Sequence, residues 1–359
     1  MTITLLTTTV AIGVAAAVNK PIVVVDLSHG QGPANADWTG NKLESLMASF
    51  EGNLTAKGLE LVWATQIDET TLADAQFLIL GSVYGSNFTD AELAAIVAWW
   101  NQGGKTIWVA GDSDYGASNI PNEMNKVLRA IGSAIRYEHT SVEDPFSNAG
   151  GAYRVVANVT NTEDVEVAGI VAGVNKVLFH GPTLLYAYYN GIAVALETTM
   201  VPNVHVVMKS GASGIIVDAD PASRPPLAHE VGQQGSFVMM AVEKYVCSHG
   251  NNKVIVSSEN AVGGYQPMYS SEYYDIALDG AKLVMQTIDW GLTIESSSDK
   301  MMSDVDSMIS TLTATINAQE SEISALTTEV EGLRTLIYVA VVIGLGGIGV
   351  GVFSILKKN

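Results

Sequence analysis

Hydrophobic and polar residues follow three successive patterns along the chain. Short apolar runs of strand type alternate with helical patterns over residues 19–140, and short strand-like runs dominate residues 141–294. A narrow apolar seam of helical period follows over residues 295–335, and an unbroken apolar run fills residues 336–356. The sequence therefore predicts a globular part in two sections, a long helix and a segment of membrane length.

The first section predicts an α/β domain, because strands and helices in alternation indicate a parallel sheet with helices on both faces. The second section is predicted to be strand-rich, and either inserted in or packed against that sheet. Residues 253–260 (KVIVSSEN) predict a further strand followed by a site-like loop, and residues 275–290 predict a closing helix. The strands expected in the first section are residues 21–28, 59–64, 77–82 and 105–111, and its helices are residues 41–58, 90–101 and 121–131.

The seam has the spacing of a coiled coil, since its positions are alternately three and four residues apart. Its flanking residues are Ser, Thr, Asp and Glu, which favours a coiled coil over a single amphipathic helix packed on the globular part. With Met302 at an a position, branched residues at a and Leu at d favour a parallel dimer, and a trimer stays open. Gln319 interrupts the seam and penalises slipped registers. The seam comprises Met302, Val305, Ile309, Leu312, Ile316, Gln319, Ile323, Leu326, Val330, Leu333 and Ile337.

Residues 336–356 contain no charge and match the hydrocarbon thickness of a bilayer, about 30 Å. Lysines in the tail, residues 357–359, predict a cytoplasmic C-terminus, with everything before the span outside. The heptad register places small residues along this segment, and Gly347 with Gly351 forms a GxxxG pair. We therefore expect a parallel homo-oligomer, dimer or trimer, whose helices continue through a lipid bilayer.

An exported N-terminal part needs a signal, and residues 1–18 form an apolar run that ends in small residues. Because the run has no basic residue before it, an uncleaved signal anchor or a buried first strand stays open. The expected location is the cell membrane, with a single span and an extracytoplasmic N-terminal domain. The composition is consistent with a segment in lipid, since 48% of the residues are hydrophobic and only 15% are charged. The net charge of -19 argues against nucleic acid as a partner.

Polar residues follow the ends of several predicted strands. Parallel strands end at one edge of a sheet, and ligands of such sheets bind outside that edge. The end of the third strand of the first section carries Ser82 and Tyr84. The candidates for binding a small polar ligand are Asp26, Ser28, His29, Gln31, Asp112, Ser113 and Asp114.

Four motifs carry a family resemblance, namely DLSHGQ, LxxAxFLILGS, FTDAELxxI and GGKTIWVAGDSD. They resemble the GIFT-type domains shared by gliding-motility transporter components and intraflagellar-transport proteins, which are related in fold to class I glutamine amidotransferases. The resemblance covers residues 21–140 and extends toward residue 290. It implies a flavodoxin-like domain that generally lacks the amidotransferase nucleophile and serves in binding or assembly.

No arrangement of nucleophile and base in the sequence predicts catalysis strongly. An amidotransferase would carry Cys in the turn that here holds Ser113, and the G-x-S-x-G spacing of a serine nucleophile is absent. Cys247 with His249 is a second candidate dyad, but a Gly-Asn-Asn turn follows it directly. The other histidines lack metal-ligand spacing, so neither a metal nor a cofactor is expected. A hydrolase is the least favoured interpretation.

The sequence thus predicts a non-catalytic, membrane-anchored, oligomeric cell-surface protein that presents an α/β domain for assembly or binding to other surface proteins. Its layout is similar to that of stalk proteins that tether archaeal surface layers. The alternative is a receptor or transporter-accessory protein that binds a small polar ligand at the strand ends. Three N-x-S/T motifs, at Asn53, Asn87 and Asn158, are candidate glycosylation sites in an exported chain.

Overall fold

The chain is described by a computed structural model. The structure divides it into two compact units, residues 1–294 and 295–359. Side chains of residues 42–45, 297–308, 310, 311, 314, 318, 342 and 344–356 are not described. The described residues are 20–29, 42–115, 119–218, 220, 224–244, 246, 251–263, 268–293 and 297–356.

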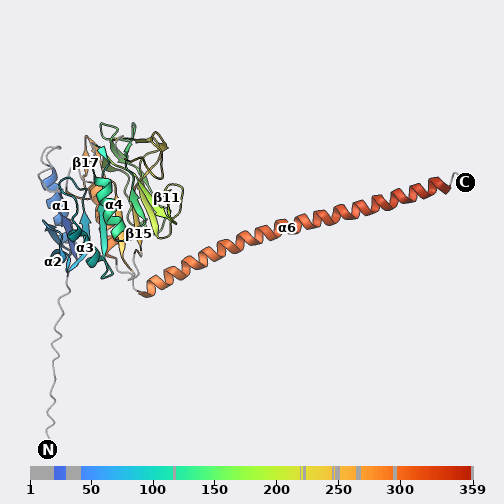
Figure 1. Ribbon diagram of the computed structural model, residues 1–359, viewed down its shortest axis with the longest axis horizontal. Helices are drawn as coiled ribbons and strands as arrows, with labels where there is room; N and C mark the ends of the chain where they lie inside the picture. The colour runs from blue at the N-terminus through green and yellow to red at the C-terminus, as the bar shows by residue number, and fades with distance from the viewer. Residues whose placement is uncertain are drawn as a thin grey trace, which may run out of the picture. The chain divides into compact units, whose positions relative to one another are not determined.

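One large mixed sheet organises the first unit (Figure 1). Its first five strands run parallel, in the order β2-β1-β3-β4-β16, and three antiparallel strands, β15, β12 and β8, extend it. The parallel strands have the order of flavodoxin-like sheets. An α/β fold with a parallel-rich sheet is therefore confirmed. The strands are β1 (Ile22–Asp26), β2 (Glu60–Ala64), β3 (Ala75–Leu80), β4 (Thr106–Ala110), β8 (Val159–Thr160), β12 (Val204–Lys209), β15 (Val238–Lys244) and β16 (Lys253–Ser257).

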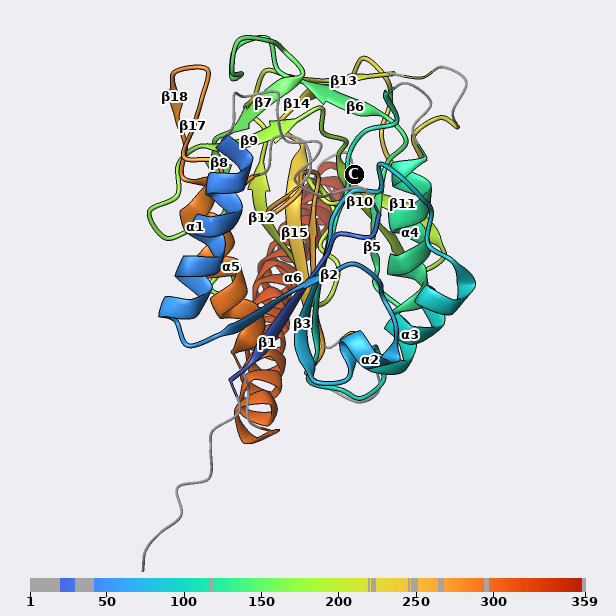
Figure 2. The same cartoon turned by 90° about the vertical axis from the view of Figure 1, so that its left-hand side faces the viewer.

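Helices cover both faces of this sheet (Figure 2). Helices α1 (Lys42–Ala56) and α5 (Gly280–Leu292) pack on one face, and α3 (Asp90–Trp100) and α4 (Ile120–Ala130) pack on the other. Successive side chains of a strand point to opposite faces, so Val23 and Val25 join the first core and Val24 joins the second. The continuous apolar runs of the sequence arise from this burial on two sides.

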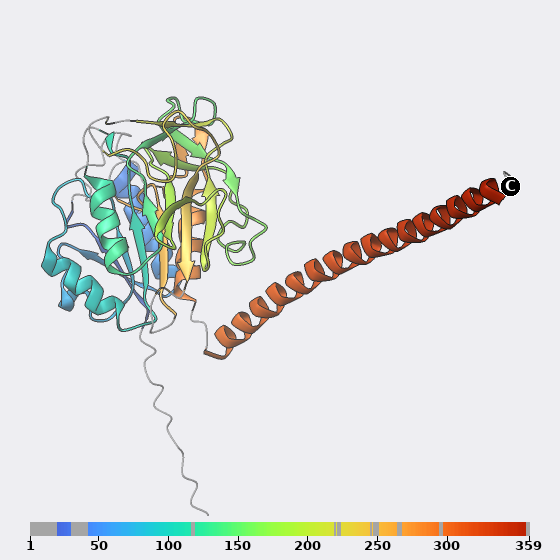
Figure 3. The same ribbon diagram turned by 45° about the vertical axis from the view of Figure 1, so that its right-hand side comes forward.

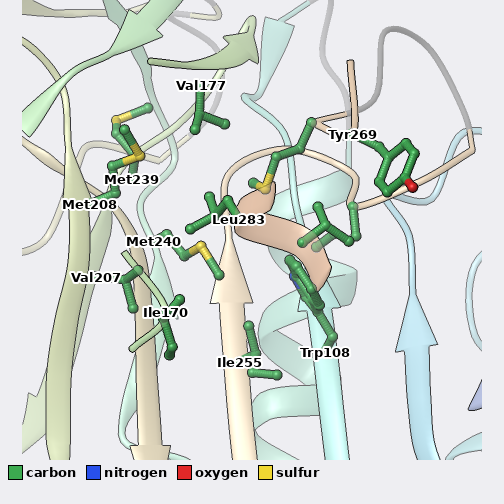
Figure 4. Close-up of a cluster of buried hydrophobic side chains, with 14 of the residues drawn as sticks. Trp108, Ile170, Val177, Val207, Met208, Met239, Met240, Ile255, Tyr269 and Leu283 are labelled. Carbon is green, nitrogen blue, oxygen red and sulfur yellow. The ribbon is translucent and has the colours of Figure 1, made fainter. Parts of the chain in front are cut away.

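The core under α5 is built from all parts of the first unit. Trp108 of β4, Ile255 of β16, Met240 of β15 and Leu283 of α5 lie together in it (Figure 4). The Trp108 indole N–H donates to the Ser257 hydroxyl at 2.8 Å, which satisfies the polar atom of this buried ring. The second section of the chain therefore shares one core with the first.

Part of the second section, together with one strand of the first, β5, forms small antiparallel sheets. The order of the first is β11-β10-β5 and that of the second is β14-β13-β6, and two further pairs are β7-β9 and β17-β18. Four strands of this section, β8, β12, β15 and β16, join the large sheet, and its other strands lie outside that sheet. The strands are β5 (Ile135–Tyr137), β6 (Ser141–Glu143), β7 (Arg154–Ala157), β9 (Val177–His180), β10 (Leu185–Tyr189), β11 (Ile192–Ala195), β13 (Gly214–Val217), β14 (Gln234–Gly235), β17 (Glu272–Tyr273) and β18 (Ile276–Ala277).

Helix α5 starts later than the sequence predicts. Residues 272–277 form the hairpin β17–β18, with Tyr274 at φ 46° and Asp275 at φ 61° in its turn. Gly280 is the first residue of the helix, and this position requires glycine because a Cβ there would lie 1.7 Å from the carbonyl oxygen of Met268. The short helix α2 (Glu69–Leu72), capped by Asp68, has no counterpart among the predicted elements.

The second unit is the helix α6 (Ser297–Leu356), whose 60 residues span about 90 Å (Figure 3). Its described apolar seam side chains are exposed in the single chain, from 45% for Ile316 to 63% for Ile323 and Ile337. A coiled coil requires a second copy to cover them, so the pairing of α6 stays a prediction.

Several predicted segments fall on residues that are not described. Residues 1–18 and 357–359 lie outside the described part of the chain, and so do the side chains of residues 344–356, around the Gly347 and Gly351 pair. Within the described residues, no helix combines the length and the apolar character needed to cross a membrane.

Candidate functional site

Three predicted residues form one network at the end of β1. The Asp26 carboxylate lies 2.6 Å from Nδ1 of His29 and accepts a hydrogen bond of 2.6 Å from the Ser28 hydroxyl. Asp26 and His29 are fully buried, and the His29 ring packs against Phe88 with centroids 4.1 Å apart. Asp26, Ser28 and His29 therefore satisfy one another inside the protein.

The charge of His29 follows from its neighbours. Burial alone would lower the pKa of His29, but the Asp26 hydrogen bond and charge, together with Glu92, raise it above the ordinary value. Glu92 lies 3.6 Å from His29 Nε2 and also closes the capping box of α3 with Thr89. The start of α3 is thus tied to the end of β1 through the buried His29 ring.

Tyr84 connects this network to a second group of polar residues. Its backbone N–H donates to the carbonyl oxygen of His29 at 2.9 Å, and its hydroxyl donates to Asp112 Oδ2 at 2.8 Å. The Tyr84 side chain is 39% exposed, so it lies at the rim of the strand ends. The two predicted groups are joined through Tyr84.

Asp112 and Glu259 form a carboxyl pair at the ends of the adjacent strands β4 and β16. Glu259 is buried and accepts backbone hydrogen bonds of 2.7 Å from His180 and Asn260. Burial and then the charge of Asp112 raise the pKa of Glu259 well above its usual range. Burial also raises the pKa of Asp112 to about 7, against the hydrogen bonds from Tyr84 and Ser113. Both carboxyl groups therefore hold their protons to higher pH than exposed carboxyl groups do.

Two buried polar groups beside this pair have no partner among the described residues. The side-chain oxygen of Asn260 accepts a hydrogen bond of 2.6 Å from the Ser82 backbone N–H. This bond links the ends of β16 and β3 across the end of β4, which lies between them. The Nδ2 atom of Asn260 and the Ser258 hydroxyl remain without a hydrogen bond to any described residue. Leaving such groups unsatisfied costs about 1–3 kcal/mol each, so the edge is chemically suited to accept a polar molecule.

The turn after β4 is shaped by packing. A Cβ on Gly111 would lie 2.5 Å from Cε1 of Tyr137, whose hydroxyl donates to the carbonyl oxygens of Val109 and Ser257. Tyr137 thereby joins the ends of β4 and β16 and fixes the position of Asp112.

Ser113 and Asp114 are buried in the same turn. The Ser113 backbone N–H donates to Asp112 Oδ1 and to the carbonyl oxygen of Gly181, and its hydroxyl accepts a 3.3 Å bond from Tyr115. The turn is a local hydrogen-bonded bend, and α4 begins later, after Asn119.

The sequence pattern identifies part of this site. Glu259 is not among the candidates that the pattern singles out, although the SSEN segment after β16 is predicted as a site-like loop. Gln31 and Cys247 lie outside the described residues. No group of three or more His, Cys, Asp or Glu residues that could hold a metal ion occurs in the described part of the chain.

A second buried charged cluster lies apart in sequence from the candidates. His229 Nδ1 lies 3.1 Å from Glu138, and its Nε2 lies 3.0 Å from Glu197. Burial would lower the pKa of His229, but hydrogen bonds to Glu138 and Glu197 raise it to about 9. Glu138 also accepts the backbone N–H groups of Leu227 and Ala228. This imidazolium therefore ties the 224–231 loop to the strands.

A surface cavity of about 670 Å³ lies elsewhere, at the β8 edge of the large sheet. It is lined by residues 159–164 and 196–201 together with three residues of β12. None of the predicted ligand-binding residues lines it.

Comparison with known proteins supports the fold only. No protein-family model matches the chain, and no curated protein matches it. A ThuA-like protein from Bacteroides uniformis aligns over 79% of this chain and 96% of its own at 13% identity, with a TM-score of 0.41. The solved N-terminal domain of IFT52 is similar over 76% of this chain and 99% of its own, with a TM-score of 0.51 and 15% identity. The similarity to the IFT52 domain supports a GIFT-like fold.

Proposed function

We propose that this chain is a non-catalytic, membrane-anchored cell-surface protein whose α6 helices associate and present the α/β domain for binding or assembly. The observation that carries the proposal is the exposed apolar seam of α6. Ile309, Leu312, Ile316 and Ile323 are all between 45% and 63% exposed in one chain. They recur at heptad spacing, so a second copy can bury them all at once.

The stability of α6 also favours association. Most helical stability in proteins comes from packing of an apolar face, and α6 has this face along much of its described length. Burying apolar surface contributes roughly 25 cal/mol per Å², so several heptads of Ile and Leu supply a large driving force. Self-association is the simplest way to satisfy a seam of this regularity.

The membrane and surface parts of the proposal rest on sequence. Residues 336–356 are uncharged and apolar, Lys357 and Lys358 follow them, and residues 1–18 have the pattern of an export signal. The family resemblance adds a role in binding or assembly. The GIFT-like fold is compatible with that role but does not specify it.

The test is the mass of the full-length protein in detergent, measured by light scattering. We expect a dimer or trimer for the wild type. Replacing both Ile316 and Ile323 with Asp places two charges in the seam and should give a monomer.

The matched control is the double variant Ser321→Asp and Ser324→Asp. It adds the same two charges at outer heptad positions of α6, so it should keep the mass of the wild type. A monomeric wild-type protein would contradict the proposal, and so would an equal loss of mass in the two double variants.

A receptor for a small polar ligand is the second candidate, and the unsatisfied Asn260 and Ser258 groups beside Asp112 and Glu259 favour it. A thermal-shift screen of the full chain in detergent with sugars, peptides and divalent ions tests it. Stabilisation of the wild type that Glu259→Gln and Asp112→Asn abolish would support a receptor. The absence of any shift would contradict it.

A further inference from the structure

Arg334 is the single basic residue between positions 301 and 356. It is exposed, and within its own chain the guanidinium lies over the ring of Tyr338, 5.8 Å from the centroid. Six acidic residues share this stretch of the chain, namely Asp304, Asp306, Glu320, Glu322, Glu329 and Glu331. The position of this one cation relative to the seam therefore decides which helix alignments gain an attractive contact.

Heptad positions follow from the seam. Val330 and Ile337 are the a positions on either side of Arg334, which makes Arg334 an e residue and Glu329 a g residue. In a parallel, in-register coiled coil, each g residue faces the e residue five positions further along the neighbouring chain. Glu329 and Arg334 are separated by that interval.

We propose that Glu329 of one chain forms an ion pair with Arg334 of a second copy, and that this pair, made once in each direction, fixes α6 in a parallel, in-register alignment. The proposal rests on the self-association proposed above and adds its orientation. It also gives the acidic helix a specific attractive contact between chains.

Other alignments lose this contact. A slip of one heptad lets Glu322 reach Arg334 in one direction, but in the other direction it sets Glu322 against Glu320. An antiparallel alignment brings g residues opposite g residues, and these include the like charges of Glu322 and Glu329. The in-register parallel alignment has two attractive pairs and sets no like charges against each other at the g and e positions of residues 308–334.

The experiment mixes two differently tagged full-length variants in detergent. Glu329→Arg leaves two Arg residues to face each other in its own oligomer, and Arg334→Glu leaves two Glu residues. Mixed oligomers restore opposite charges in both directions, so we expect the ratio of mixed to unmixed oligomers to exceed its value for random mixing by roughly tenfold. The double variant, which carries both changes, should associate with itself as the wild type does.

Glu331→Arg is the matched control, because it makes the same charge change at an outer b position. Its mixture with Arg334→Glu should give the random proportion of mixed oligomers, and native mass spectrometry counts each species. Random mixing of Glu329→Arg with Arg334→Glu, in a protein whose wild type is oligomeric, would overturn the pairing alone. A wild type that is monomeric would instead overturn the proposed function.

Discussion

Replacing His229 with Gln tests the buried charge that ties the 224–231 loop to the strands. The His229 side chain is 1% exposed and lies between Glu138 and Glu197. Its pKa rises from 6.5 to about 9 in the fold, and each unit of such a difference corresponds to about 1.4 kcal/mol. Protonation of His229 therefore contributes about 3 kcal/mol to the free energy of unfolding.

The direction with pH follows from the raised pKa. The contribution is complete below pH 6.5, where His is protonated in both states, and it is lost as the pH rises through about 9. Urea denaturation of the first unit in the full-length protein, monitored by tryptophan fluorescence at three pH values from acidic to basic, measures it. We expect the wild type to exceed His229→Gln by about 3 kcal/mol at about pH 6 and the difference to shrink by about pH 9.5.

His205→Gln is the matched control, since its ion pair with Asp164 is partly exposed and should contribute at most about 1 kcal/mol. If the wild type and His229→Gln kept the same stability difference at all three pH values, the assignment of a buried imidazolium would be refuted.

Two further changes address the strand ends. Asp112→Asn removes a carboxyl whose pKa is raised from 3.8 to about 7. Ionisation of this group in the fold lowers the stability of the wild type progressively between these two pH values. The variant should therefore be as stable as the wild type below pH 3.8 and more stable by about 1–2 kcal/mol at about pH 8, a value reduced for partial solvent exposure. Equal urea denaturation curves at the basic pH value would contradict this. Gly111→Ala places a Cβ 2.5 Å from the Tyr137 ring and should cost about 1–3 kcal/mol in urea denaturation, whereas Gly104→Ala meets no atom within 4 Å and gives a control limited to backbone strain.

Local patterns are enough to predict the buried strands of the large sheet, because each is a continuous apolar run bounded by polar residues. The group of Asp26, Ser28 and His29 is predictable for the same reason, since Asp26 ends β1 and the other two follow it directly. Glu259 is harder to place. Its strand β16 pairs with β4 although the two are far apart in sequence, and no local pattern encodes that pairing.

Long-range ion pairs and unusual turns also lie beyond the sequence pattern. His229 meets Glu138 and Glu197 only after the second section has folded, and neither spacing resembles a motif. The β17–β18 hairpin turns at Tyr274 and Asp275, which take positive φ without the Asn-Gly signal that usually marks such a turn.

The central claim is that α6 associates along its apolar seam in the membrane-anchored protein. Disulfide crosslinking in membranes tests it with Leu326→Cys, a seam position, and Ser321→Cys, an outer position, each in a chain with Cys247→Ser. We predict a rapid crosslinked dimer for Leu326→Cys and none for Ser321→Cys. Equal crosslinking at both positions, or none at Leu326→Cys, would contradict the claim.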